Sequence, residues 1–308
     1  MSKELRIIFL GTPDFAAASL KRLVESQVNV VAVITAPDKP KGRGKKLGVS
    51  AVKEYALEAG LPVLQPTNLK SHEFLEELKS YRADLQIVVA FRMLPVAVWD
   101  MPPLGTFNLH ASLLPQYRGA APINWAIMNG EKETGVTTFF LKHEIDTGEI
   151  IFQEKEPIYE DDNVGTLYHR LMKKGADLVL KTVRAVEAGD NPRFPQNMDQ
   201  EIKHAPKIFK EDCKIDWQQK SETIRNFIRG LSPYPAAWTE FHKKTLKIFE
   251  VGKAKEGTNK PIGEFYSDGK NYIRVNTKDG TLNILDLQLE GKKRMNVEDF
   301  LRGYQFNN

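Results

Sequence analysis

The chain has 308 residues, a formal net charge of +4 at pH 7 and 41% hydrophobic residues. This length suits two domains of about 100–200 residues each, and the composition is typical of a soluble globular protein. The longest apolar runs, such as residues 85–91, are too short to cross a bilayer. A single cysteine, Cys213, excludes an internal disulfide and a cysteine zinc cluster, and the first residues lack the apolar core of a signal peptide. We therefore expect a cytoplasmic protein without a membrane-spanning segment.

The N-terminal half alternates short apolar runs with segments whose apolar residues have helical spacing. The runs predict strands, and the spaced segments predict helices. In chain order we expect a strand at 5–10, a helix at 15–25, a strand at 28–34, a helix at 51–59, a short strand at 61–64, a helix at 71–79, strands at 85–91 and 107–109, a helix at 121–128 and a strand at 135–141. This order predicts the α/β class, with a doubly wound sheet that carries helices on both faces.

The C-terminal part has a different pattern. A long helix is expected at 164–188, and the Gly and Pro residues after it make 189–206 a predicted linker. A helix at 221–229 is followed by short strands at 237–241, 245–251, 263–266, 272–275 and 282–289, which turn residues separate. Short strands of this kind predict a small β-barrel. We accordingly expect two domains, residues 1–188 and 207–308, joined by residues 189–206.

The charge is unevenly divided along the chain. Residues 207–308 carry 19 basic and 14 acidic residues, a net charge of +5 (19 − 14), whereas residues 1–206 carry the other 25 basic and 26 acidic residues, a net charge of −1. A basic C-terminal part beside a neutral N-terminal part favours a polyanionic partner.

An amide, an imidazole and a carboxylate form the main candidate site. Asn108 and His110 are two positions apart, so on a strand both side chains point to the same face. Asp146 follows 36 positions after His110 (146 − 110). The amide and imidazole can stabilise a developing oxyanion, and the carboxylate can orient the imidazole or take a proton. These groups predict acyl transfer to an amine, and because no metal-ligand spacing accompanies them we expect no metal.

Two loops that follow predicted strands could contact a substrate. Residues 11–14, Gly-Thr-Pro-Asp, lack the G-x-G-x-x-G pattern of a dinucleotide site, although a helix N-terminus here could bind an anion. Residues 91–95 follow another strand, and their backbone groups could read the hydrogen-bonding edge of a flat heterocycle. Core packing is the alternative interpretation of residues 91–95.

A basic stretch, residues 37–46, holds five Lys and Arg residues and one acidic residue. Its two Pro and two Gly residues predict that it forms neither a regular helix nor a regular strand. It could be a solvated surface loop, or it could be a mobile finger that binds a phosphate backbone.

Several strings of this sequence resemble the 10-formyltetrahydrofolate-dependent formyltransferases. They are I-I-F-L-G-T-P-D-F-A at 7–16, P-D-K-P-K-G-R-G-K-K at 37–46, N-L-H-A-S-L-L-P-Q-Y-R-G-A-A-P-I at 108–123, E-T-G-V-T at 133–137, D-T-G at 146–148 and G-K-K at 291–293. The resemblance covers nearly the whole chain, and the basic stretch with the C-terminal barrel is similar to the members that act on tRNA. Phe91-Arg92 is a departure, because many relatives carry Tyr-Gly there.

The resemblance implies a Rossmann-like formyltransferase domain followed by a small OB-like β-barrel that binds tRNA. It implies that a formyl group passes from 10-formyltetrahydrofolate to the α-amino group of initiator methionyl-tRNA, without a metal. The implied catalytic residues are Asn108, His110 and Asp146. The implied folate-binding residues are Phe91, Arg92, Met93, Leu94, Ser112, Leu113, Leu114 and Pro115. The implied tRNA-binding residues are Lys39, Lys41, Arg43, Lys45, Lys46, Lys292 and Lys293.

Three other functions remain open on the residues alone. The same three groups could formylate another amine, such as a nucleotide-linked amino sugar or a glycinamide ribotide, which would need neither the basic stretch nor the basic barrel. They could also serve a hydrolase that deformylates the folate. A non-catalytic RNA-binding module would have no use for the three groups. We expect a monomer, since no apolar seam suggests an obligate dimer.

Overall fold

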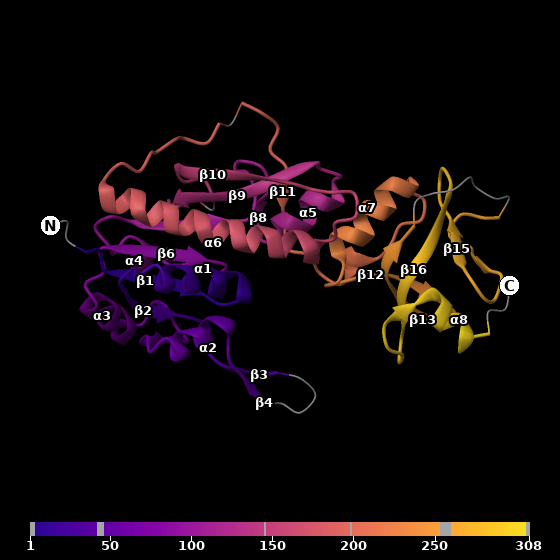
Figure 1. Cartoon of the computed structure of the whole chain (residues 1–308), viewed down its shortest axis with the longest axis horizontal. Coiled ribbons are helices and arrows are strands. Elements are labelled where there is room, and N and C mark those ends of the chain that lie inside the picture. Colours follow the sequence, from indigo (N-terminus) through magenta and orange to yellow (C-terminus); the bar gives the residue numbers. More distant parts are fainter. Residues whose placement is uncertain (1–3, 42–45, 145, 198, 253–259, 306–308) are drawn as a thin grey trace. The chain divides into compact units, whose positions relative to one another are not determined.

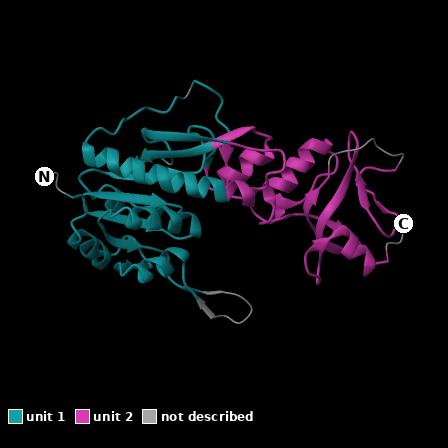
Figure 2. Ribbon diagram, viewed as in Figure 1, with its two compact units in different colours: residues 1–118, 135–156, 169–203 teal, residues 119–134, 157–168, 204–308 magenta. Residues whose placement is uncertain are grey.

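The computed structural model describes residues 4–41, 46–144, 146–197, 199–252 and 260–305. The chain divides into two compact units, shown in Figure 2. Unit 1 contains residues 1–118, 135–156 and 169–203, and unit 2 contains residues 119–134, 157–168 and 204–308. Among the described residues, no helix has both the length and the apolar character that a membrane span requires.

A seven-stranded sheet forms the centre of unit 1 (Figure 1). Its strand order is β10-β9-β7-β6-β1-β2-β5. In chain order the strands are β1 (Ile7–Gly11), β2 (Val30–Ile34), β5 (Val63–Leu64), β6 (Leu85–Val89), β7 (Thr106–His110), β9 (Glu133–Phe140) and β10 (Ile150–Pro157). Strands β5, β2, β1, β6 and β7 are parallel, and β9 is antiparallel to β7. The predicted α/β class is confirmed, and β10 is an edge strand that the sequence pattern did not predict.

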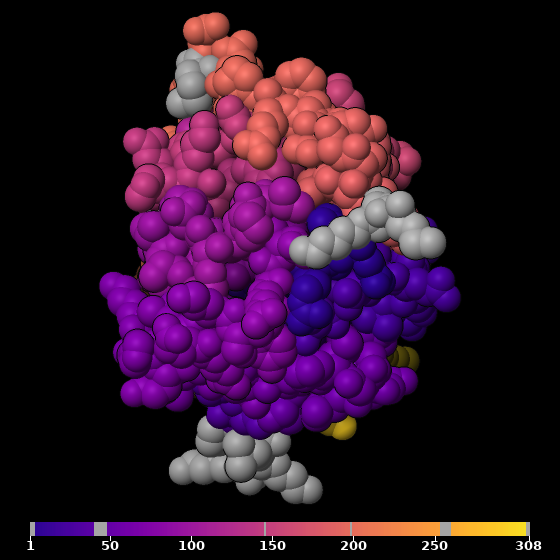
Figure 3. Space-filling view, turned by 90° about the vertical axis from the view of Figure 1, so that its left-hand side faces the viewer, coloured from indigo at the N-terminus to yellow at the C-terminus, as the bar shows by residue number. Residues whose placement is uncertain are grey.

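Helices lie on both faces of this sheet. They are α1 (Asp14–Glu25), α2 (Ala51–Glu58), α3 (His72–Ser80), α4 (Val96–Trp99) and α6 (Val164–Ala188). In the space-filling view of Figure 3, indigo and purple residues of the N-terminal half cover the lower part of the surface. Salmon-coloured residues, which include the end of α6, cover the upper part.

The alternation of side chains along β7 fixes which face carries the candidate site. Leu109 points to α6, since a Cβ added at Gly175 would lie 2.8 Å from Leu109 Cδ2. Asn108 and His110 alternate with Leu109 and therefore point to the opposite face. Val88 pairs with Asn108, and it packs in a core cluster with Phe74 of α3. The candidate side chains thus share the face that α3 covers.

The basic stretch forms a β-hairpin, so the prediction that it has no regular strand was wrong. β3 (Lys39–Lys41) and β4 (Lys46–Gly48) pair antiparallel, with Pro40 opposite Leu47. Proline lacks an N–H, but it is tolerated in a strand whose other edge is unpaired. A two-stranded ribbon has two such edges, and the hairpin therefore accommodates Pro40.

A polar network holds the base of this hairpin. Lys53 Nζ donates to Asp38 Oδ2 at 2.5 Å and to Gln65 Oε1 at 2.7 Å. Gln65 Nε2 in turn donates to Asp38 Oδ1 at 2.8 Å and to the Ala36 carbonyl at 2.8 Å. The hydrogen bond from Lys53, and next the one from Gln65, hold the pKa of the Asp38 carboxyl below its ordinary value of 3.8. Asp38, which precedes the hairpin, is therefore hydrogen-bonded to Lys53 of α2 and to Gln65, which follows β5.

Unit 2 contains a curled antiparallel sheet with the order β12-β13-β16-β15-β14, and β17 pairs with β16. Its strands are β12 (Ala237–Phe241), β13 (Lys244–Val251), β14 (Phe265–Ser267), β15 (Ile273–Asn276), β16 (Thr281–Leu289) and β17 (Met295–Asn296). Its other elements are α5 (Pro122–Met128), a 3-10 helix (Glu211–Cys213), α7 (Ser221–Leu231) and α8 (Val297–Arg302), with β8 (Arg118–Gly119) and β11 (His204–Ala205) at its borders along the chain. The predicted barrel is confirmed as an antiparallel half-barrel, to which α8 is an unpredicted addition.

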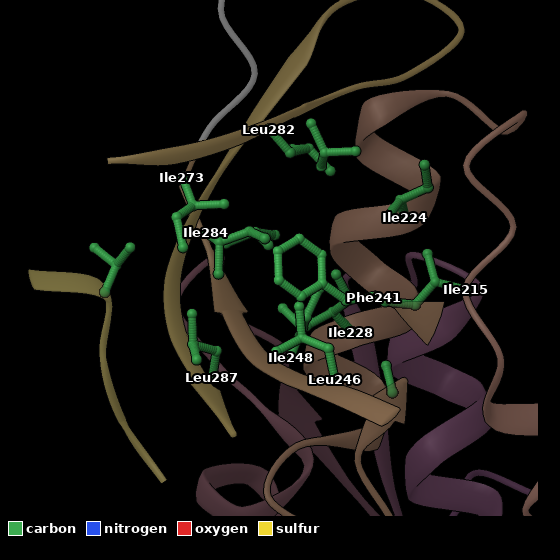
Figure 4. Packing of buried hydrophobic residues seen from close by; sticks show 14 of the residues in the cluster. Ile215, Ile224, Ile228, Phe241, Leu246, Ile248, Ile273, Leu282, Ile284 and Leu287 are labelled. Atoms are coloured by element: carbon green, nitrogen blue, oxygen red, sulfur yellow. The ribbon is translucent and has the colours of Figure 1, made fainter. Parts of the chain in front are cut away.

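An apolar core joins this half-barrel to α7 (Figure 4). Ile224 and Ile228 lie one helical turn apart on α7, and both are at most 2% exposed. They face Ile248 and Leu282 of the sheet, which are fully buried, and the ring of Phe241 lies between helix and strands. The apolar face of α7 therefore closes the open side of the half-barrel.

Candidate active site

The candidate site lies at the carboxyl edge of the sheet in unit 1. β2 and β6 lie on either side of β1, so the sheet is extended in opposite directions from β1. In α/β proteins ligands bind outside the carboxyl ends of the strands at such a switch point. Gly11 pairs with Val89, and Val89 pairs with Leu109. Because the strands are parallel, residues 11–14, residues 90–94 and the end of β7 meet at this edge.

The structure brings His110 and Asp146 together. His110 ends β7, and its Nε2 lies 2.8 Å from the carbonyl oxygen of Tyr117. Because a carbonyl can only accept, Nε2 carries a hydrogen and donates it. Nδ1 faces Asp146 Oδ2 at 3.9 Å, and the two side chains are only 7% and 11% exposed. Nδ1 is therefore the ring nitrogen that faces the carboxylate.

Asn108 lies on the same face of β7, two residues before His110. It is half-buried, and its backbone pairs with Val88 of β6 and with Phe139 of β9. Its carboxamide makes no hydrogen bond to any other described residue. A carboxamide on a strand that is paired on both sides, with its N–H groups uncommitted, can donate to a ligand oxygen.

The turn that carries Asp146 has an unusual backbone. Asp146 has a φ of +55°, in the left-handed region that residues other than glycine seldom adopt. A Cβ at Gly148 would lie 1.5 Å from the carbonyl oxygen of Phe140, so only glycine fits there. Gln196 Nε2 donates to the carbonyl oxygens of Asp146 at 2.7 Å and of Gly148 at 2.9 Å. The Asp-Thr-Gly string is thus a tight turn that another part of the chain holds.

Residues 112–115 form a buried turn directly after His110. Ser112 Oγ donates to the Gln116 carbonyl at 2.6 Å, and Thr137 Oγ1 donates to the Ser112 carbonyl at 2.6 Å. Gln153 Nε2 donates to the Leu114 carbonyl at 2.9 Å. The hydroxyl of Ser112 is therefore used within the turn, and the predicted folate-binding residues 112–115 support the end of β7.

Residues 91–94 are a second predicted folate-binding segment. Phe91 and Leu94 pack against the core cluster that contains Phe74, whereas Met93 is 75% exposed. Arg92 donates to the carbonyls of Pro66 and Thr67, which keeps its guanidinium on a neighbouring loop. Within the described part of the chain, the backbone N–H groups of residues 92–94 donate to no other group. These N–H groups can therefore serve a ligand at this edge.

The predicted tRNA-binding residues fall into two groups. Lys39 is exposed at the start of the hairpin, whereas Arg43, Lys45 and the side chains of Lys41 and Lys46 lie outside the described residues. Lys292 and Lys293 are exposed in unit 2 at the turn between β16 and β17. Neighbouring Arg294 is paired with Asp286 at 2.7 Å, so its charge is partly neutralised.

Three residues near the site were missed at the sequence level: Tyr117, Thr137 and Gln196. Tyr117 acts through its backbone carbonyl, so its side chain carries no signal of this contact. Gln196 lies in a segment without periodicity, 50 residues after Asp146. Only Thr137, which lies opposite His110 on β9, could have been found, from strand pairing.

The described part of the chain shows neither a cluster of metal ligands nor a reactive cysteine. Among the described residues, no three His, Cys, Asp or Glu side chains gather as a metal ion would require. Cys213 is 1% exposed, its Sγ donates to the Phe209 carbonyl at 3.2 Å, and burial raises the pKa of its thiol. A buried thiol with a raised pKa is a poor nucleophile.

Sequence comparison relates the chain to known proteins over nearly its full length. The family profile described as "Formyl transferase" matches residues 5–183, and that of "Formyl transferase, C-terminal domain" matches residues 207–305. A methionyl-tRNA formyltransferase of Parabacteroides distasonis is 58% identical over 99% of this chain and 98% of its own. One of Phocaeicola vulgatus is 60% identical over 98% of this chain and 97% of its own.

Solved structures share the fold at low sequence identity. HypX from Aquifex aeolicus in complex with tetrahydrofolic acid has a TM-score of 0.64 and 22% identity, and the match covers 99% of this chain and 49% of HypX. An N-formyltransferase from Helicobacter canadensis, in complex with folinic acid and dTDP-3-aminofucose, has a TM-score of 0.67 and 22% identity over 94% of this chain and 100% of its own. At this identity the likeness concerns the fold alone.

Proposed function

The chain belongs to the formyl transferase family, and we propose that it transfers a formyl group from 10-formyltetrahydrofolate to the α-amino group of initiator methionyl-tRNA. The product is N-formylmethionyl-tRNA for translation initiation. The observation that carries the proposal is the His110–Asp146 pair, with Asn108 on the same face of β7 and its carboxamide making no hydrogen bond to another described residue. The full-length relatives that are named methionyl-tRNA formyltransferases support this acceptor.

The three groups can perform each step of the reaction. The neutral amine attacks the formyl carbon, a C–N bond forms, and the formyl oxygen becomes an oxyanion. Asn108 donates an N–H to this oxygen, and a proton on Nδ1 of His110 provides a second donor. Asp146 receives the proton of the attacking amine, directly or through water, and a proton is returned to N10 as the C–N10 bond breaks. N10 leaves as a neutral amine, so protons and charges balance.

We assign the folate to the edge where β1, β6 and β7 end. The uncommitted N–H groups of residues 92–94 are suited to the hydrogen-bonding edge of a pterin. Arg92 leaves them accessible because its guanidinium is held by two carbonyls of the neighbouring loop. The buried turn at the end of β7 would support the floor of this site through Ser112, Leu113, Leu114 and Pro115.

We assign the tRNA to the hairpin of residues 39–48 and to the basic C-terminal part. Residues 1–188 would form the catalytic domain, 189–206 its connection, and 207–308 the tRNA-binding domain. The network around Asp38 supports a hairpin that is fixed at its base. Each phosphate that Lys or Arg neutralises steepens the salt dependence of binding, so tRNA affinity should fall strongly between low and moderate salt. We further propose that the protein acts in the cytoplasm, where initiator methionyl-tRNA is used for translation, and that it acts as a monomer.

A transfer assay with competing acceptors tests this proposal. The acceptors are charged initiator tRNA, charged elongator tRNA, a nucleotide-linked amino sugar and glycinamide ribotide, each with 10-formyltetrahydrofolate. We expect formyl transfer to initiator methionyl-tRNA with a kcat/KM at least about 100-fold above that for the small amines, a difference of ~2.7 kcal/mol. Equal transfer to a small amine would favour the alternative acceptor. Loss of the formyl group without a formylated acceptor would indicate a hydrolase.

A further inference from the structure

One segment of unit 1 lies beside the sheet and contacts the surroundings of both His110 and Asp146. This segment, residues 193–197 and 199–203, follows α6 and runs above β10 in Figure 1. Phe194 pairs with Ile150 at the start of β10 through two backbone hydrogen bonds of 2.8 and 2.9 Å. Ile150 is four residues after Asp146 (150 − 146). The segment is therefore attached to the chain close to the turn that carries the carboxylate.

Gln196 is the residue of this segment that reaches the Asp146 turn. The residue is 9% exposed, and Nε2 donates to the carbonyls of Asp146 and Gly148 at 2.7 and 2.9 Å. Its Oε1 accepts from Arg118, with 3.1 Å to Nε. The carboxamide thus uses both N–H groups and its oxygen at once, and a carboxylate in its place would have no hydrogen to donate.

The same segment also fixes the partner of His110. The Tyr117 N–H donates to the Lys203 carbonyl at 2.6 Å, and the Lys203 N–H donates to Gln116 Oε1 at 2.9 Å. These bonds hold the backbone around Tyr117, whose carbonyl accepts from His110 Nε2 at 2.8 Å. The segment therefore contacts both sides of the pair: Lys203 holds the backbone that accepts from His110, and Gln196 holds the turn that carries Asp146.

The geometry points to Gln196 as a positioning residue for formyl transfer. Its carboxamide stabilises the left-handed backbone of Asp146, so that the carboxylate faces His110 Nδ1. A sparsely populated backbone conformation persists only when its surroundings determine it, and here the two hydrogen bonds from Gln196 do so. A displacement of about 1 Å at a catalytic group can cost on the order of 100-fold in rate. This inference rests on the proposed function, because that function gives Asp146 its part in the transfer.

Gln196→Glu tests the inference, because it keeps the size of the side chain and removes both donors. We expect kcat for formyl transfer to fall about 10- to 100-fold, with KM for both substrates changed less than about twofold. Gln200→Glu is the matched control, since it makes the same change at an exposed residue of the same segment, and it should keep the wild-type kcat. If Gln196→Glu does not fold, Gln196→Ala removes the carboxamide without adding a charge and is expected to give the same loss of kcat.

The decisive readout is the combination with Asp146→Asn. If Gln196 acts through Asp146, Gln196→Glu lowers kcat in the wild-type background and has no further effect in the Asp146→Asn background. A merely structural role would lower kcat by the same factor in both backgrounds, and that result would overturn the inference. A Gln196→Glu enzyme as active as Gln200→Glu would overturn it as well. If the wild-type chain formylates no methionyl-tRNA, it is the proposed function that fails.

Discussion

His110 Nδ1 faces Asp146 Oδ2 at 3.9 Å, although the two residues come from different segments of unit 1. The imidazole is oriented by the Tyr117 carbonyl on its other side, and the Asp146 turn is held by Gln196. Neither side chain reaches this position through local sequence alone. The two side chains are nearly buried and face each other, so we expect them to act as a unit in catalysis.

A double-mutant cycle tests whether His110 and Asp146 form such a unit. His110→Ala and Asp146→Asn should each lower kcat on the order of 100- to 1000-fold. Residues that act together give losses that do not add, so the double variant should be close to the worse single variant. Steady-state kcat for the four proteins provides the measurement. Losses that multiply across the cycle would mean that the two groups act independently.

Asn108 is expected to act as an oxyanion donor. Asn108→Asp keeps the size of the side chain but replaces its N–H groups with an acceptor. This change should lower kcat on the order of 100- to 1000-fold, about 3–4 kcal/mol, and leave KM for both substrates nearly unchanged. A normal kcat with a raised KM would assign Asn108 to substrate binding instead.

The ion pair between Lys53 and Asp38 predicts a pH-dependent contribution to stability. The hydrogen bonds from Lys53 and Gln65 hold the pKa of Asp38 below 3.8 in the folded state. Ionised Asp38 therefore stabilises the fold above its unfolded pKa of about 3.9, and the effect is lost as the pH falls through the folded pKa. Lys53→Met should lower the free energy of unfolding at pH 6 and have a smaller effect below pH ~3.

Urea unfolding of this variant at several pH values measures the effect. Lys21→Met is a suitable control, since Lys21 pairs with Glu25 at 3.8 Å on the exposed surface of α1. It should change the free energy of unfolding little at any pH. A Lys53→Met effect that is equally large at pH 3 and pH 6 would contradict the assigned ion pair.

Cys213 is expected to report on the opening of the half-barrel core. It is the single cysteine of the chain, it is 1% exposed, and burial raises the pKa of its thiol. Its alkylation in the folded protein should be at least about 100-fold slower than that of free cysteine, because opening a core site costs several kcal/mol. The alkylation rate at neutral pH measures this, with the urea-unfolded chain as the reactive control. A fast reaction of the folded chain would show that Cys213 is accessible.

The parallel sheet could be predicted from the sequence because its strands are buried on both faces. Such strands are continuous apolar runs, and the Leu85–Val89 segment is an example in which every residue is buried. β10 was missed because charged residues such as Glu154 and Lys155 interrupt its apolar pattern. The hairpin at 39–48 was missed because its Pro and Gly residues indicate a loop, whereas pairing across a two-stranded ribbon tolerates Pro40.

Part of the candidate site could also be predicted from the sequence, because of strand geometry. Asn108 and His110 share a strand, so a spacing of two placed them on one face. Asp146 could be predicted as a catalytic residue only from the chemistry of its carboxylate and from the family resemblance, because its distance from His110 depends on how the chain folds. Gln196 and Tyr117 act on or through backbone carbonyls, and such contacts leave no pattern in the sequence.

The part of His110 and Asp146 in catalysis is tested most directly by a single-turnover measurement of formyl transfer from labelled 10-formyltetrahydrofolate to initiator methionyl-tRNA, with enzyme in excess over both substrates. Wild-type protein and Asp146→Asn are compared under conditions in which both bind the two substrates fully. We expect that the label reaches the methionine amine with wild-type protein, and that Asp146→Asn slows this step at least about 100-fold. Transfer by Asp146→Asn at the wild-type rate, or no transfer to methionyl-tRNA by the wild-type protein, would contradict this expectation.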